Sequence, residues 1–182
     1  MLLVLAAEFT NGLTDAPNAI ATVVSTRVLS PLHAVVMAAL LNVAGVLVTG
    51  NAVAFTIGKG IVEPEVIGLH TVGAAMLSIV IWSIVTWRCG IPTSETHALV
   101  AGLTGAGLAT AGPSVLLWEG WKKVLVGIGF STVLGFLGSF VFMVAIYWLF
   151  RRVRRAFVNS LFGRLQILSA ALMAFSHGSN DG

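Results

Sequence analysis

Residues 122–150 read KKVLVGIGFSTVLGFLGSFVFMVAIYWLF, and after the two lysines no charged residue occurs until Arg151. A helix needs about 20 consecutive apolar residues to cross the ~30 Å hydrocarbon core of a bilayer, and this stretch is longer than that. Similar runs fill the rest of the chain, separated by short segments with prolines and charges. The apolar runs cover residues 1–26, 31–58, 67–88, 93–111, 122–150 and 165 onward. The sequence therefore predicts several membrane-spanning helices.

The overall composition also indicates a membrane protein. Of 182 residues, 57% are apolar and 9% are charged, whereas a soluble globular domain carries about 25% charged residues. A soluble fold of this size could not cover so much apolar surface. An outer-membrane barrel would show alternating segments of about 10 residues, and the sequence lacks that pattern. We expect an all-α, polytopic transmembrane helix bundle in an inner or plasma membrane.

The basic residues indicate an orientation in the lipid bilayer rather than a nucleic-acid partner. Five of the ten lie between Arg151 and Arg164, in a short segment between two apolar runs. Cytoplasmic loops are rich in arginine and lysine, so we expect this segment inside the cell. Counting spans backward then places Arg27 and Arg88 inside as well. Glu63 and the N-terminus fall outside.

The segment from residue 67 to residue 111 has two interpretations. Its apolar runs, 67–88 and 93–111, are joined by a short break that contains Pro92. The two runs form either two full crossings or a re-entrant hairpin with a half-helix. Small residues recur in the second run at the spacing that lets helices pack closely in lipid, which favours a packed bundle in both cases.

Polar side chains interrupt the first apolar run at residues 10–19, TNGLTDAPNA. Such residues cost free energy at membrane depth unless they line a cavity or have partners. Pro17 lacks a backbone N–H and Gly12 loosens a helix, so we expect a broken first helix with free carbonyl oxygens beside Asp15. Hard cations prefer carboxylate and carbonyl oxygens. This cluster is therefore a candidate cation site.

A second polar cluster, GIPTSETH at residues 90–97, precedes another apolar stretch. Pro92 ends the preceding helix, and Thr93 is expected to cap a new helix whose first turn begins at Ser94. Free amides and hydroxyls at a helix N-terminus form an anion site. A capping box, in which Glu95 bonds back to the cap, would explain the same residues without a ligand.

A third cluster, FSHGSNDG at residues 175–182, is similar to the first. Aligned on their glycines, residues 12–15 (GLTD) match residues 178–181 (GSND). The two clusters lie on spans separated by an odd number of crossings, so their helices run in opposite directions. Inverted repeats whose broken helices meet at the membrane midplane are typical of secondary transporters.

Together these clusters resemble the motifs of the inorganic phosphate transporter (PiT) family. The family signature GANDVANA occurs once in each inverted half. Residues 12–19, GLTDAPNA, look like the first copy, and residues 177–182, HGSNDG, look like the opening of the second. Residues 91–99, IPTSETHAL, look like the family hairpin motif Pro-x-Ser-(Ser/Thr)-(Ser/Thr)-His. The three motifs occur in the family's order and cover the chain from end to end.

The resemblance implies a homodimeric carrier of inorganic phosphate that is coupled to a cation, Na⁺ or H⁺, and has no other cofactor. Phosphate would lie among the hairpin hydroxyls and the signature aspartates, and the cations would lie at the signature Asp and Asn residues. The implied phosphate-binding residues are Thr93, Ser94, Glu95, Thr96, Asp15 and Asp181. The implied cation-binding residues are Asp15, Asn18, Asn180 and Asp181.

The sequence departs from the family pattern at three points. Thr14 replaces the first signature's Asn. Glu95 replaces a hydroxyl, and a carboxylate beside phosphate repels it unless the carboxylate is protonated or bound to a cation. The sequence stops at Gly182, before the rest of the second signature. On this resemblance, residues 1–163 form the first inverted repeat and residues 164–182 form a truncated start of the second.

Two other classes of protein fit parts of the sequence. A structural or channel-like bundle would explain the spans but not three polar clusters inside them. A membrane-embedded metal enzyme could use Glu95 and His97, but an i, i+2 spacing puts the two on different faces of a helix. Cys89 is the single cysteine, so a cysteine-based metal site is excluded. We expect a transporter rather than an enzyme.

Overall fold

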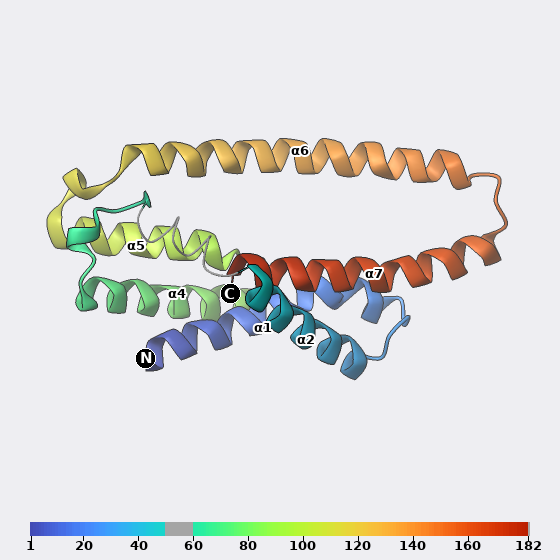
Figure 1. Ribbon diagram of the computed structural model, residues 1–182, viewed down its shortest axis with the longest axis horizontal. Coiled ribbons are helices and arrows are strands. Elements are labelled where there is room, and N and C mark those ends of the chain that lie inside the picture. The colour runs from blue at the N-terminus through green and yellow to red at the C-terminus, as the bar shows by residue number, and fades with distance from the viewer. Residues whose placement is uncertain (50–59, 182) are drawn as a thin grey trace.

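The computed structural model describes residues 1–49 and 60–181, and it confirms an all-α helix bundle. The last part of the predicted run 31–58 and Gly182 lie outside the described residues. The elements are α1 (Leu2–Ser25), α2 (Pro31–Thr49), the short 3-10 helix η1 (Pro64–Val66), α4 (Leu69–Cys89), α5 (Glu95–Ala111), a second 3-10 helix η2 (Pro113–Val115), α6 (Trp118–Phe150) and α7 (Arg155–Asp181). In Figure 1, α6 runs along the whole length of one edge, and the other helices lie below it.

Four of these helices are long and apolar enough to cross a membrane. They are α2, α4, α6 and the Arg155–Asn180 part of α7. The first apolar run has the required length, since α1 contains 24 residues, but polar residues interrupt it. The fourth run forms the 17-residue α5, which extends about 25 Å and is shorter than the ~30 Å hydrocarbon core.

The short hairpin of α4 and α5 turns back near the middle of the molecule. In Figure 1, the turns that follow α1 and α6 lie at one end of the bundle, whereas α4 ends about midway. Arg88, in the last turn of α4, therefore does not reach the end that carries Arg27 and Arg151, in contrast to the predicted grouping. The chain reverses here because Gly90 adopts the left-handed conformation, with φ 66°, and ends the helix.

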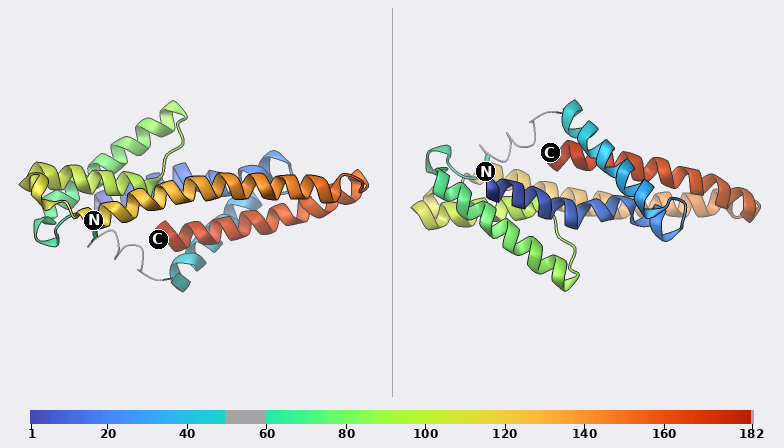
Figure 2. Two further views of the ribbon diagram at one scale, coloured as in Figure 1. Left: turned by 90° about the horizontal axis from the view of Figure 1, so that it is seen from above. Right: turned by 90° about the horizontal axis from the view of Figure 1, so that it is seen from below.

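The geometry of this hairpin favours the re-entrant interpretation over two full crossings. Figure 2 shows α5 running along the long axis of the molecule while α4 is inclined to it. Val62 and Val115, which flank the hairpin's open end, pack with Ala75, Val100 and Leu103 in a buried apolar cluster. The open end of the hairpin is therefore fixed at one end of the bundle, and its tip lies inside the bundle's length.

The expected break in the first helix does not interrupt α1, which continues through Pro17. Packing on both sides of the proline accounts for this continuity. After Pro17, Ala19, Ile20 and Val23 are buried in a cluster with alanines of α2 and α7. Before Pro17, Thr14 contacts Glu95 at the hairpin tip. These contacts stabilise the continuous helix, and this stabilisation outweighs the loss of the single backbone hydrogen bond that proline removes.

The helices α2 and α7 cross at two glycines. A Cβ atom added to Gly178 would meet the backbone of Asn42, and one added to Gly45 would meet the carbonyl oxygen of Phe175. Only glycine permits two backbones to approach so closely. This crossing fixes the C-terminal end of α7, with its polar cluster, against α2 and beside α1.

Candidate functional site

The polar residues of α1 form one stripe because they recur every three or four positions. The stripe contains Asn11, Thr14, Asp15 and Asn18. The Asn18 side-chain amide donates to the carbonyl oxygen of Thr14 at 3.4 Å and to the Asp15 carboxylate at 3.5 Å. Asp15 is half-buried and Asn18 is exposed. The predicted cation residues of the first signature therefore lie together on one helix face.

The hairpin tip begins a helix, as predicted, but its capping residue is one position later than expected. Ser94, rather than Thr93, is the N-cap, with φ −117° and ψ 121°, and its hydroxyl accepts from the backbone N–H of His97 at 3.4 Å. Thr93 instead accepts from the indole N–H of Trp82 at 2.9 Å. Thr96 follows in the first turn and is half-buried. The first turn of α5 thus combines hydroxyls with free backbone amides.

Glu95 does not form a capping box, because its carboxylate turns toward two other helices. Its side chain is buried, with 7% exposed. Oε1 accepts from the Ser83 hydroxyl of α4 at 2.5 Å and from the Thr14 hydroxyl of α1 at 3.3 Å. Glu95 therefore joins α5 to α4 and to the polar stripe of α1.

A cavity of about 860 Å³ lies on another side of the hairpin tip. Its polar lining includes Thr93, Ser94 and His97, and its floor is formed by small residues of α5 such as Ala101 and Gly105. Glu95 is not among the lining residues. The predicted phosphate residues at the hairpin are therefore divided: the hydroxyls of Thr93 and Ser94 face this cavity, while the carboxylate faces α1 and α4.

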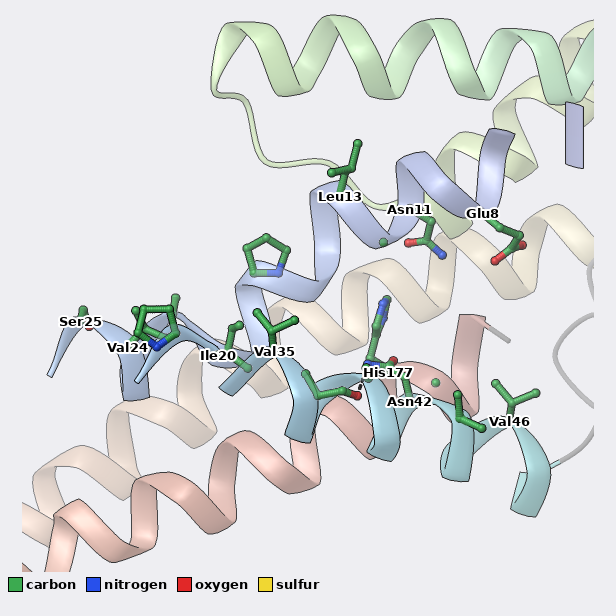
Figure 3. Close-up of a pocket in the computed structure, with 18 residues that line it drawn as sticks. Glu8, Asn11, Leu13, Ile20, Val24, Ser25, Val35, Asn42, Val46 and His177 are labelled. Carbon is green, nitrogen blue, oxygen red and sulfur yellow. Dashed lines mark hydrogen bonds between the residues drawn. The ribbon is translucent and has the colours of Figure 1, made fainter. Parts of the chain in front are cut away.

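The first and third polar clusters meet at a second cavity, of about 780 Å³, between α1, α2 and α7. Asn11 and Gly12 of α1 and His177 and Gly178 of α7 line it, together with Asn42 of α2. Figure 3 shows Asn11 and His177 pointing toward the same space from opposite sides. The structure thus brings the two similar motifs together, as an inverted pair would require.

The end of α7 carries the remaining predicted site residues. Asn180 is exposed. Asp181 is the last residue of α7, and its side chain lies outside the described part of the structure. His177 and Gly178, which line the second cavity, precede these two residues on α7.

Sequence reasoning missed three polar residues at this site. Ser83 is fully buried and bonds to Glu95, Trp82 bonds to Thr93, and Asn42 lines the second cavity. A signal for Ser83 was present, because Thr71, Ala75, Ile79 and Ser83 follow one another at four-residue spacing on the buried face of α4. A polar residue on such a face needs a buried partner.

Glu95 and His97, the pair considered for a membrane-embedded metal enzyme, lie in different surroundings. Within residues 1–49 and 60–181, no group of three or more His, Cys, Asp or Glu side chains could hold a metal ion. Glu95 is buried and His97 is exposed, which agrees with their expected position on different faces of the helix.

Comparisons with known proteins agree with the motif resemblance. Residues 11–160 match the pattern described as "Phosphate transporter family". The chain is 44% identical to a "Probable low-affinity inorganic phosphate transporter" of Rhizobium meliloti (strain 1021), over 96% of the chain and 52% of that protein. A protein of the same name from Bacillus subtilis (strain 168) is 38% identical, over 97% of the chain and 54% of the relative.

A third relative of that name, from Streptomyces halstedii, is 41% identical over 94% of the chain and 80% of its own length. The chain spans about half the length of the first two relatives. No solved structure matches it.

Proposed function

We propose, because the chain belongs to the phosphate transporter family, that it forms one half of a carrier that moves inorganic phosphate across a cell membrane together with a cation. Its four candidate spanning helices support a membrane location. Phosphate is the solute named for its relatives. The remaining steps of the proposal concern which residues bind the two ions and how the binding is coupled.

The contact between Thr14 and Glu95 is the observation that carries this proposal. It places the first turn of α5, which suits an anion, directly beside the polar stripe of α1, which suits cations. A divalent phosphate ion cannot enter a medium of low dielectric constant without countercharge. An anion site and a cation site that lie side by side supply that countercharge. The binding of each ion then depends on the binding of the other.

Phosphate is proposed to bind at the start of α5 through Thr93, Ser94 and Thr96, with Asp15 and Asp181 reaching it through bound cations. The proposed cation ligands are Asp15, Asn18, Asn180 and Asp181. The family resemblance assigns Glu95 to phosphate as well. The direction of its carboxylate toward Ser83 and Thr14 supports an indirect role, through the position of α5.

The carrier is proposed to contain two inverted repeats, with residues 1–163 as the first and residues 164–182 opening the second. The meeting of Gly12 and Gly178 at one cavity supports this division. Rocking of one repeat against the other would expose the site to each side of the membrane in turn. The assembled carrier is proposed to be a homodimer in the plasma or inner membrane, coupled to Na⁺ or H⁺.

Phosphate uptake into liposomes tests the proposed function. We expect purified full-length protein to take up phosphate with saturable kinetics and to require a cation gradient. Non-saturating flux would instead indicate the channel-like alternative. The Ser94→Asp variant should lower the apparent phosphate affinity by at least about tenfold, because a second negative charge at the site repels the anion.

The variant Ser30→Asp is the matched control. Aspartate caps a helix about as well as serine does, so both variants should remain folded. Ser30 lies just before α2, where its hydroxyl accepts from the backbone N–H of His33 at 3.5 Å, far along the chain from the hairpin. An equal loss of affinity in both variants would refute a phosphate site at Ser94.

A further inference from the structure

One end of the bundle carries a dense group of arginines without acidic partners. The turn between α6 and α7 supplies four of them, all with exposed side chains: Arg151, Arg152, Arg154 and Arg155. The sequence contains no aspartate or glutamate between Glu119 and Asp181. Within residues 1–49 and 60–181, none of these arginines forms a salt bridge. The described chain therefore leaves their positive charge uncompensated.

The turn after α1 adds two more arginines to the same end of the molecule (Figure 1). The Thr26 hydroxyl donates to the side-chain oxygen of Gln166 at 2.8 Å, which joins this turn to α7. Arg27 follows Thr26, Arg164 lies two positions before Gln166, and both arginines are exposed. Residues 16–62 contain no aspartate or glutamate. We call the six residues together the arginine end: Arg27, Arg151, Arg152, Arg154, Arg155 and Arg164.

Aromatic side chains beside the arginine end indicate that it lies at the level of the lipid headgroups. Tyr147 and Trp148, in the last turn of α6, are 75% and 64% exposed. Tyrosine and tryptophan are enriched at the membrane–water interface. The Arg151 guanidinium lies over the Trp148 ring, 4.1 Å from its centroid. The Phe150 ring packs edge-on against Phe162 of α7, with centroids 5.1 Å apart, and this contact holds the turn in place.

The start of α7 adds a further requirement for negative charge. The helix begins at Arg155, and its first turn contains no acidic residue. The N-terminal amides of a helix carry a partial positive charge and lack acceptors within the helix. Arginines at this position therefore add to the positive end of the dipole instead of balancing it. A bound anion would accept from these amides and offset the charge of the arginines at the same time.

Membrane topology alone explains the positive charge but not the choice of arginine. The positive-inside rule counts lysine and arginine alike. Residues 124–182 contain five arginines and no lysine. Lys122 and Lys123 lie near the opposite end of α6, where Lys122 pairs with Glu119 at 2.7 Å. Arginine presents a planar fork that binds two phosphate oxygens at once, whereas lysine acts as a point charge. The residue type therefore favours a phosphate group as the partner.

We propose that the arginine end binds the phosphodiester headgroups of anionic phospholipids. Such lipids supply the negative charge that this end lacks, at the depth where its aromatic residues lie. A free phosphate ion fits less well, because neither cavity described above is lined by an arginine. Exposed arginines spread over two turns suit several headgroups better than one small ion. This surface is separate from the hairpin tip and does not depend on phosphate transport.

Stabilisation by added lipid tests the proposal. Purified full-length protein in a neutral detergent would be titrated with phosphatidylglycerol, and in parallel with phosphatidylcholine and with inorganic phosphate, while its thermal unfolding midpoint is recorded. We expect phosphatidylglycerol to raise the midpoint saturably and by more than phosphatidylcholine does. The effect should weaken as NaCl is added, because salt screens exposed charges. Any shift with inorganic phosphate should be the same in the wild type and the arginine variants.

Two double variants and a matched control locate the lipid. Arg154→Gln with Arg155→Gln should weaken the apparent affinity for phosphatidylglycerol about thirtyfold, since each basic residue near an anionic surface contributes to binding. Arg154→Lys with Arg155→Lys keeps the charge, loses the fork and should weaken the affinity less. Lys122→Gln with Lys123→Gln removes the same amount of charge near the opposite end of α6 and should bind as the wild type does.

Arg27→Gly separates lipid binding from the stability of the fold. Arg27 has φ 58°, in the left-handed region that glycine adopts without strain. The substitution should therefore leave the midpoint in neutral detergent unchanged or raise it, while it weakens the apparent affinity for phosphatidylglycerol about fivefold. An arginine with a purely structural role would give the opposite result.

Three results would overturn the proposal. One is an equal response of the wild-type protein to phosphatidylglycerol and phosphatidylcholine. Another is an equal loss of affinity in the arginine-to-glutamine and lysine-to-glutamine double variants, which would show a dependence on net charge alone. The third is a joint loss of the responses to phosphatidylglycerol and inorganic phosphate in the arginine variants, which would identify a site for free anions. None of these measurements involves phosphate uptake, so their outcome is independent of the proposed function.

Discussion

Asp15 carries the negative charge of the first signature. Its surroundings allow a substitution to remove that charge with little change in packing. The side chain is half-buried, and the amide of Asn18 donates to it at 3.5 Å from one turn further along α1. Asparagine at position 15 would have nearly the same volume and could still contact Asn18. Any loss of function in that variant would therefore report the missing charge.

We expect Asp15→Asn to abolish cation-coupled phosphate uptake in the full-length protein while the protein remains folded. The physical reason is that an amide cannot balance a cation as a carboxylate does. Uptake into liposomes and the thermal unfolding midpoint should be measured together. Wild-type uptake by this variant would remove Asp15 from the cation site.

Asn18→Ala provides a graded comparison at the neighbouring position. It removes a neutral ligand from an exposed side chain, so it should weaken the dependence of uptake on cation concentration more than it weakens phosphate affinity. The measurement is uptake over a matrix of cation and phosphate concentrations. The reverse pattern would indicate that Asn18 binds phosphate rather than the cation.

At the scale of elements, the sequence was sufficient for the helices but not for their contacts. The apolar runs predicted the long helices, although α7 begins at Arg155, within the arginine cluster that was expected to connect two helices. Pro92 correctly marked the start of a new helix at the hairpin tip. The continuity of α1 through Pro17 could not be predicted, because it depends on packing against α2 and α7. The direction of Glu95 could not be predicted either, since its partner Thr14 lies 81 positions away.

The same limit applies to the capping residue of α5. Thr93 and Ser94 are both good N-caps by residue type, and local pattern alone cannot choose between them. The indole of Trp82 decides the outcome by donating to Thr93. Ser94 then becomes the N-cap, and Glu95 becomes the first helical residue. That shift of one position directs the carboxylate toward α1 and α4.

The crossing of α2 and α7 allows a direct test of packing. Gly178→Ala should destabilise the protein by about 1–3 kcal/mol, because the added methyl group meets the backbone of Asn42. Gly135→Ala in α6 is the control, since nothing lies within 4 Å of a Cβ atom at that position. Denaturation midpoints in one detergent compare the two. Equal midpoints would show that the helices do not cross at Gly178.

At the scale of the whole molecule, the charged turns define two ends. The turns after α1 and α6 lie together in Figure 1, and the segments around η1 and η2 lie at the opposite end. By the positive-inside rule, we propose that the arginines that follow α6 lie at the cytoplasmic end. In this proposal the N-terminus faces outward, and α1 runs from outside to inside.

Cysteine labelling in intact cells measures this orientation. In a Cys89→Ser background, cysteines at Gly60 and Ser114 should react with an impermeant reagent from outside, and a cysteine at Ala156 should react only after permeabilisation. The reverse pattern would invert the orientation of every helix. It would leave the pairing of the two polar motifs intact.

The long helix α6 links the protein to the thickness of its membrane. None of its 33 residues is buried, and at about 1.5 Å per residue it extends roughly 50 Å, well beyond a ~30 Å hydrocarbon core. Such a helix must tilt, or the bilayer around it must thicken. Because α6 connects the hairpin to α7 along the chain, we expect a change of its tilt to shift the hairpin relative to α7. A change in lipid chain length would therefore change the tilt of α6 and, in the proposed carrier, the distance between the hairpin tip and α7.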